Sequence, residues 1–122
     1  MVGGRVPASR RREECVMAKY LAKARYNAEG ARALVKDGRS ARVAAVTKAT
    51  KAIGGKVESF YFAYSGDDAF VIVDVPDAAS GLALSLAVNA SGSVSLELVP
   101  LITAKEMDAA AEIMVKYRAP GQ

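Results

Sequence analysis

The chain has 122 residues, of which 52% are hydrophobic and 25% charged, a composition typical of one globular domain. It has no histidine and one cysteine, Cys15, which excludes histidine-based catalysis, the usual Cys/His zinc sites and a disulfide within the chain. Part of the net charge of +4 comes from arginines that precede Met17, so the rest of the chain is closer to neutral and a poor match for nucleic acid; these are Arg5, Arg10, Arg11 and Arg12.

Residues 1–16 show no apolar periodicity. We expect a disordered basic extension there, a domain over residues 17–118 and a flexible end over residues 119–122. The first segment lacks the apolar core of a secretory signal, and no apolar run reaches the ~20 residues of a membrane helix. We therefore expect a cytoplasmic protein with no membrane partner, and Met17 reads as a natural start.

Residues 19–26 alternate between two sets of side chains, which predicts a first strand. Asn27 is suited to cap the helix that follows, with Glu29 in its first turn. The run at 36–39 interrupts this helix, and Ser40 is suited to cap a second segment that ends at Gly54-Gly55. The second segment is expected to turn apolar residues inward and basic ones outward: Val43, Val46, Ala49 and Ile53 against Arg42, Lys48 and Lys51.

The stretch 57–75 reads as two strands joined by a tight turn at 65–68. Both registers of each strand are apolar, so we expect a hairpin that is buried on both faces. A chain of this size can cover one face with its own helices, and the other face then calls for a second subunit. The alternating sets are Val57, Tyr61 and Ala63 with Phe60, Phe62 and Tyr64, then Val71, Val73 and Val75 with Phe70 and Ile72.

Asp77 is a suitable N-cap for a helix over residues 78–90, which is apolar on nearly every side and again asks for a partner. Residues 94–98 alternate as a fourth strand. A capping box of Thr103 with Glu106 then opens a terminal helix, whose one face is expected to hold Met107, Ala111 and Met114.

The resulting order is β-α-β-β-α-β with a trailing helix, the α+β arrangement called ferredoxin-like. This fold has a four-stranded antiparallel sheet with two helices on one face. The other face would expose large apolar side chains, which monomers rarely do. We therefore expect a homodimer or larger assembly in which two such sheets face each other, in the manner of a dimeric α/β barrel.

Asp74 is the best candidate for chemistry. It follows Phe70 and Ile72 on one face of a strand, among apolar neighbours, where a carboxylate needs a partner or has a raised pKa. Lys23 and Arg25 occupy one register of the neighbouring strand and are candidate partners. The alternative is a structural ion pair with no chemistry.

Tyrosines are concentrated on the first two strands and could line a ligand cavity or serve as ordinary sheet residues: Tyr20, Tyr26, Tyr61 and Tyr64. Asn89 could point into the same cavity or bond the last carbonyls of its helix. The candidate ligand-binding residues are therefore Lys23, Arg25, Tyr26, Tyr61, Asp74 and Asn89. No metal cluster, nucleotide loop or nucleophile–base pair is visible, so we expect no metal and no cofactor.

Seven stretches of the chain match the pattern of one known family: residues 17–21, 29–32, 34–38, 54–58, 60–62, 71–77 and 86–92. On these stretches the chain, from Met17 to about Thr103, resembles the GYD-domain family of small bacterial proteins. The resemblance implies a ferredoxin-like fold and self-association, and it implies no established activity. The sequence departs from the family at the motif that names it: Asp68 takes the acidic place, Asp67 stands where tyrosine is usual, and Ser65 falls where a glycine often precedes it.

Three functional hypotheses remain open. The leading one is a non-catalytic or accessory homo-oligomer that binds a small, aromatic or acidic molecule between subunits. The second is a cofactor-free isomerase or monooxygenase of the dimeric α/β barrel type, with Asp74 as acid or base. The third and weakest is a nucleic-acid-associated protein that uses the arginines of residues 1–16.

Overall fold

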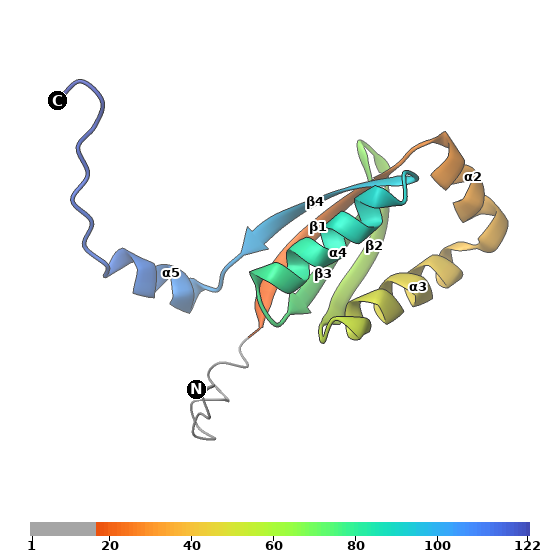
Figure 1. Ribbon diagram of the computed structural model, residues 1–122, viewed down its shortest axis with the longest axis horizontal. Coiled ribbons are helices and arrows are strands. Elements are labelled where there is room, and N and C mark those ends of the chain that lie inside the picture. Colours follow the sequence, from red (N-terminus) through yellow and green to blue (C-terminus); the bar gives the residue numbers. More distant parts are fainter. Residues whose placement is uncertain (1–16) are drawn as a thin grey trace, which may run out of the picture.

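The computed structural model describes residues 17–122, which build a four-stranded antiparallel sheet with helices on one of its faces (Figure 1). The strands lie in the order β2-β3-β1-β4, so the predicted ferredoxin-like α+β fold is confirmed. The elements in chain order are β1 (Ala18–Tyr26), α2 (Ala28–Asp37), α3 (Arg39–Ala52), β2 (Lys56–Ser65), β3 (Asp67–Val75), α4 (Ala78–Ala90), β4 (Val94–Leu101) and α5 (Ala104–Ala111).

Three helices begin at the caps that the sequence predicts. The Asn27 side chain accepts a hydrogen bond of 2.8 Å from the Gly30 amide, and the Asp77 side chain accepts one of 2.8 Å from the Ser80 amide. Thr103 and Glu106 form the reciprocal bonds of a capping box. These side chains satisfy amides that have no partner inside the helix, and so they fix where α2, α4 and α5 start.

Two local predictions are wrong. Ser40 does not cap α3: Gly38 is the N-cap, and its φ of 91° turns the chain so sharply that α3 begins at Arg39, directly after the bend. The terminal helix is also shorter than expected. It ends at Ala111, so Met114 lies beyond it and shares no helical face with Met107.

The core lies between the sheet and the helices and is built from small side chains. On the central strands these are chiefly Ala22, Ala24, Ala69, Val71, Val73 and Val75. Small residues also allow backbones to approach closely. A Cβ atom on Gly30 of α2 would lie 2.4 Å from the Ser93 carbonyl oxygen, which is far inside van der Waals contact. Glycine at this position therefore lets α2 sit against the start of β4.

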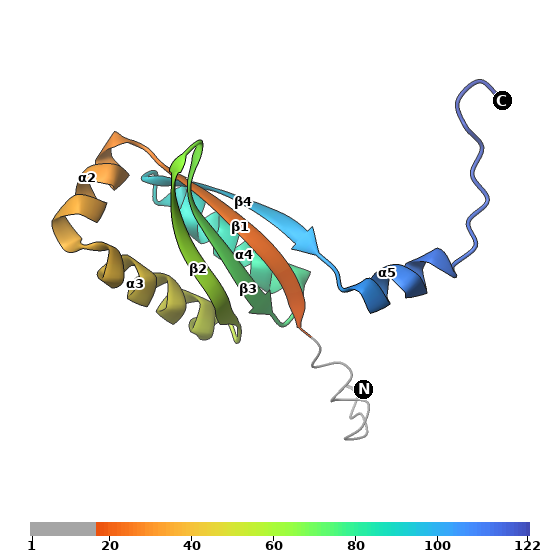
Figure 2. The ribbon, with the colours of Figure 1, turned by 180° about the vertical axis from the view of Figure 1, so that it is seen from behind.

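Several large apolar side chains remain uncovered in the single chain. On the outer side of α4, Leu82 is 58% exposed and Leu86 is 61% exposed, so this helix is not buried all round as its composition suggested. Beyond β4, α5 and the last residues extend away from the sheet (Figure 2), and Met114 is 94% exposed. Figure 2 also shows the sheet face that carries no helix.

Candidate functional site

The sheet face without helices, here called the open face, has an apolar centre between two charged ends. Side chains directly opposite each other on neighbouring strands share a face, so the strand pairing defines its rows. The central row joins Ser59, Ile72, Leu21 and Val99, and the next holds Tyr61, Phe70, Lys23 and Glu97. One end is formed by Lys56, Asp74, Lys19 and Leu101.

Asp74 lies on the open face and is only 7% exposed. Lys19 Nζ lies 2.9 Å from its Oδ1 atom and also pairs with Glu58. The hydrogen bonds to Glu58 and Asp74 raise the pKa of Lys19, so the ammonium stays protonated at neutral pH. The candidate partners Lys23 and Arg25 do not reach Asp74, because the register sets Lys19 opposite Asp74 and Lys23 opposite Phe70.

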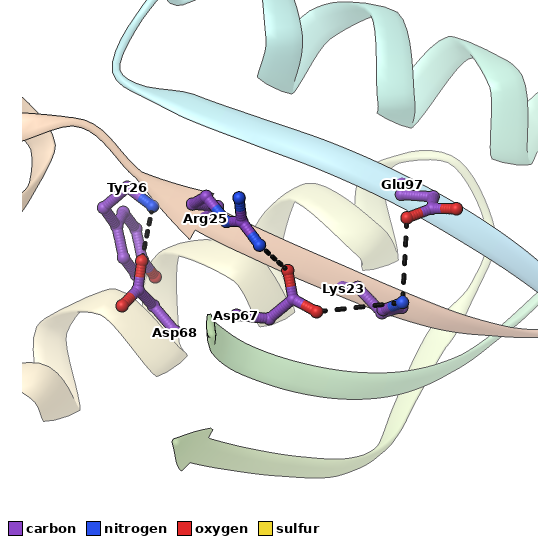
Figure 3. Close-up of polar contacts among 6 residues, drawn as sticks. All are labelled: Lys23, Arg25, Tyr26, Asp67, Asp68 and Glu97. Carbon is purple, nitrogen blue, oxygen red and sulfur yellow. Dashed lines mark hydrogen bonds and ion pairs between the residues drawn. The ribbon is translucent and has the colours of Figure 1, made fainter. Parts of the chain in front are cut away.

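Lys23 and Arg25 instead converge on Asp67, at the start of β3 (Figure 3). Lys23 Nζ lies 3.7 Å from Asp67 Oδ2 and 3.8 Å from Glu97 Oε1, and Arg25 Nη2 lies 3.2 Å from Asp67 Oδ1. Asp67 thus joins the two cations that sequence reasoning had assigned to Asp74. Lys19, Lys23 and Arg25 of the open face are thus each paired with at least one carboxylate.

Asp68 next to it has a different role. Its Oδ2 atom accepts a hydrogen bond of 2.8 Å from the Tyr26 amide at the end of β1 (Figure 3). This bond ties the β2–β3 turn to the point where β1 gives way to α2. Asp67 and Asp68 are two of the positions at which the chain was compared with the family motif. Asp67 belongs to an ion cluster, and Asp68 is bonded to a backbone amide.

The candidate tyrosines lie on opposite faces of the sheet. Tyr61 is on the open face and is 70% exposed, whereas Tyr20 and Tyr26 lie on the helix side. The Tyr20 ring lies beside Gly81 of α4. The side chain of Tyr64 lies outside the described part of the chain. Tyr26 and Tyr61 therefore do not share one cavity within a single chain.

Asn89 serves to join α4 to β4. Its Oδ1 atom accepts a bond of 2.8 Å from the Leu96 amide, and its Nδ2 atom donates to the Leu96 carbonyl at 3.2 Å and to the Ser85 carbonyl at 2.8 Å. Both ends of the amide are thus engaged by the backbone. The six candidate ligand-binding residues fall into three places: the open face, the helix side and the α4–β4 junction.

A second space, which sequence reasoning missed, lies on the other side of the sheet. It is a cleft of about 470 Å³ between the sheet and the helices α2, α3 and α4, here called the helix-side cleft. Ten of its 24 lining residues are alanine or glycine, and Tyr26, Phe60 and Leu84 are among the larger groups. Alanines at positions 41, 45 and 49 place a strip of small side chains along one face of α3.

Arg42 also lines this cleft, although its charge predicted an outward position on α3. Its guanidinium carbon lies 5.8 Å from the centroid of the Tyr26 ring, a cation–π distance. The Nε atom is buried and, within residues 17–122, has no hydrogen-bond partner. Arg42 precedes the cleft-lining Ala45 and Ala49 by three and seven positions on α3, and this helical spacing is the signal that could have placed it here.

The sequence analysis also considered a metal site, a membrane helix and a contact with nucleic acid. Within residues 17–122, no group of three or more histidine, cysteine, aspartate or glutamate side chains is arranged to hold a metal ion. None of the helices described is long and apolar enough to span a membrane. The arginines of residues 1–16, on which the nucleic-acid hypothesis depends, lie outside the described residues.

Comparison with known proteins places the chain by its sequence. Neither curated proteins nor solved structures gave a match. A family model described as GYD domain matches residues 20–111, from Tyr20, the third residue of β1, to the end of α5. The match spans every strand and helix described above, apart from the first residues of β1. The chain therefore belongs to the GYD-domain family.

Proposed function

We propose that the protein is a self-associating, non-catalytic protein that binds a small molecule in the helix-side cleft of each chain. The observation that carries the proposal is the cleft itself. Its volume of about 470 Å³ falls within the range of small-molecule sites, and its lining is mainly apolar with a few polar groups. The small side chains on α2, α3, α4 and the sheet leave this space open within a single chain, so no partner chain is needed to form it.

The helix-side cleft is a better ligand site than a space between two open faces. The charged groups on the open face already pair with one another: Asp74 with Lys19, and Asp67 with Arg25. A ligand there would have to break these pairs, whereas Arg42 in the cleft has a donor with no partner among the described residues. Catalysis by Asp74 stays a prediction, and no contact of this carboxylate favours it over a structural role.

The open face supports self-association. Leu21, Ile72 and Val99 form an apolar row between charged ends, on a face that none of the helices described covers (Figure 2). Two-fold symmetric association needs a self-complementary surface, and a face whose cations and anions are already balanced brings no net charge to its copy. A second copy of this chain is therefore the occupant that we propose for the open face.

Sedimentation velocity tests the association. At micromolar concentration the chain should sediment as a dimer or larger. Ile72→Glu places a charge in the apolar row and should shift the protein toward monomer, whereas Val35→Glu on the exposed side of α2 should leave the assembly unchanged. A wild-type monomer, or an equal effect of both substitutions, would contradict the proposed interface.

Calorimetric titration with a neutral aromatic alcohol, 2-naphthalenemethanol, tests the cleft. Ala45→Phe fills the space and should weaken binding by about tenfold or more, since it removes the volume that the ligand occupies. Ala44→Phe adds the same side chain at the neighbouring exposed position, outside the cleft lining, and should have little effect. Binding that survives Ala45→Phe would show that the cleft is not the site.

A further inference from the structure

Among the described residues that line the helix-side cleft, Arg42 is the one cationic group, and the rest of the lining is mainly apolar, with Asp37, Ser91 and Ser93 as further polar residues. From this we propose that its ligand is an organic carboxylate, whose apolar body fills the alanine-lined space and whose carboxylate binds Arg42. The inference rests on the proposed function, because it names the class of molecule that the same cleft would take. It goes further by assigning the recognition to one side chain.

The first argument is the hydrogen-bonding state of Arg42. Guanidinium carries five N–H donors and cannot lose its charge in a protein, so a buried donor without an acceptor is costly. Nε of Arg42 is such a donor among the described residues. Buried polar atoms without partners are rare in proteins, and this one belongs to a side chain that lines the cleft, where a ligand oxygen could accept a hydrogen bond from the guanidinium.

The second argument is the electrostatic setting. Asp37 also lines the cleft, but its side chain is exposed and no ion pair joins it to Arg42 within residues 17–122. Arg42 also lies at the fourth position of α3, near the positive end of the helix dipole. The N-cap of α3 is Gly38, which offers no side-chain acceptor, and the first turn has no acidic residue. Neither the N-cap nor the first turn of α3 therefore supplies a negative charge to Arg42.

The third argument is shape. The guanidinium carbon of Arg42 lies 5.8 Å from the centroid of the Tyr26 ring, and the planar fork of a guanidinium matches a planar, two-oxygen acceptor. Beyond it the lining is apolar, with Phe60, Val71 and Leu84 among the contacts available to a ligand. A carboxylate attached to an aromatic or medium-chain aliphatic body matches both ends. A strongly polar metabolite would leave the apolar lining of the cleft without apolar contacts.

The test compares acids with neutral molecules of the same body. The probes are 2-naphthoate and decanoate, with 2-naphthalenemethanol and 1-decanol as their alcohols, titrated into the full chain by calorimetry. We expect each acid to bind at least about tenfold more tightly than its alcohol. Arg42→Met keeps the apolar stem and should remove this preference while alcohol binding persists. Arg32→Met, on the exposed side of α2 and outside the cleft lining, should retain it.

The outcomes separate the two proposals. If acid and alcohol bind equally, or if Arg42→Met keeps the preference for the acid, the carboxylate assignment is wrong and the cleft stays a small-molecule site. If none of the four probes binds, or if those that bind do so equally well to Ala45→Phe, the proposed function fails together with the inference. Far-ultraviolet circular dichroism of each variant checks that a lost preference is not a lost fold.

Discussion

Lys19 and Asp74 lie opposite each other on the two central strands, with Nζ 2.9 Å from Oδ1. The carboxylate is nearly buried while the ammonium is about a third exposed and shared with Glu58. The pair therefore combines a buried anion with a cation that keeps contact with water. This relationship gives Asp74 a structural role that can be measured.

Replacing Asp74 with Asn should lower the free energy of unfolding by about 1–3 kcal/mol, measured by urea denaturation. The loss should fall short of that for a fully buried pair, because Glu58 still neutralises Lys19. Asp67→Asn is the matched control: the Asp67 side chain is 22% exposed against 10% for Asp74, its partners lie at 3.2 and 3.7 Å, and the cost should be below about 1 kcal/mol. Equal losses in the two variants would contradict the structural role of Asp74.

Gly30 and Gly81 are both buried helical glycines, but they should respond differently to alanine. Gly30→Ala would drive its Cβ to 2.4 Å from the Ser93 carbonyl oxygen, so we expect a clear fall in melting temperature. At Gly81 the nearest atom is the Tyr20 ring at 3.3 Å, which needs to move by only a few tenths of an ångström. The better helix propensity of alanine, worth up to about 1 kcal/mol, should make Gly81→Ala neutral or stabilising. A greater loss at Gly81 than at Gly30 would contradict the packing described.

Asp77 provides a pH-dependent contribution to stability. Hydrogen bonds from the Ser80 amide and side chain hold the pKa of the Asp77 carboxyl below its usual value of 3.8. A lowered pKa in the folded state stabilises above the unfolded pKa, and this stabilisation is lost as the pH falls through the folded value. Asp77→Asn keeps a capping side chain that does not titrate. The melting temperature of the native chain relative to this variant should therefore fall between about pH 5 and pH 2.5, and a flat difference would be evidence against the cap.

Arg42→Met should not destabilise the ligand-free protein. Removing the guanidinium gives up a cation–π contact of about 0.5–1 kcal/mol, but it also removes a buried donor that costs about 1–3 kcal/mol. We expect the free energy of unfolding to stay level or to rise by up to about 1 kcal/mol, as at binding sites that sacrifice stability. A loss of about 2 kcal/mol or more would indicate that Arg42 is a structural residue. Arg32→Met controls for the general effect of charge removal.

The sequence predicts the elements well where the signal is local. Alternation marks β1 and β4, apolar runs on either side of a tight turn mark β2 and β3, and the caps Asn27, Asp77 and Thr103 mark three helix starts. Each signal depends on a few adjacent residues. Ser40 misled because a glycine with positive φ ends one helix and begins the next in a single residue. Local pattern does not show how tightly two helices are joined.

The site was harder to predict, since it depends on register and on tertiary packing. The register of β1 against β3 determines which cation lies opposite Asp74. The observed register places Lys19 there, and another register would place Lys23 there instead. Arg42 was assigned to the surface by its charge alone. Its inward position follows from a cleft that exists only once α2, α3 and α4 lie over the sheet.

Native mass spectrometry of the protein purified from its own cells tests the account most directly, because it reports assembly and retained ligand together. The account predicts a dimer or larger assembly in which each chain carries the added mass of a small acid. The added mass should be absent from Arg42→Met while the assembly persists, since the cleft and the open face lie on opposite sides of the sheet. A bare monomer at micromolar concentration would contradict the account.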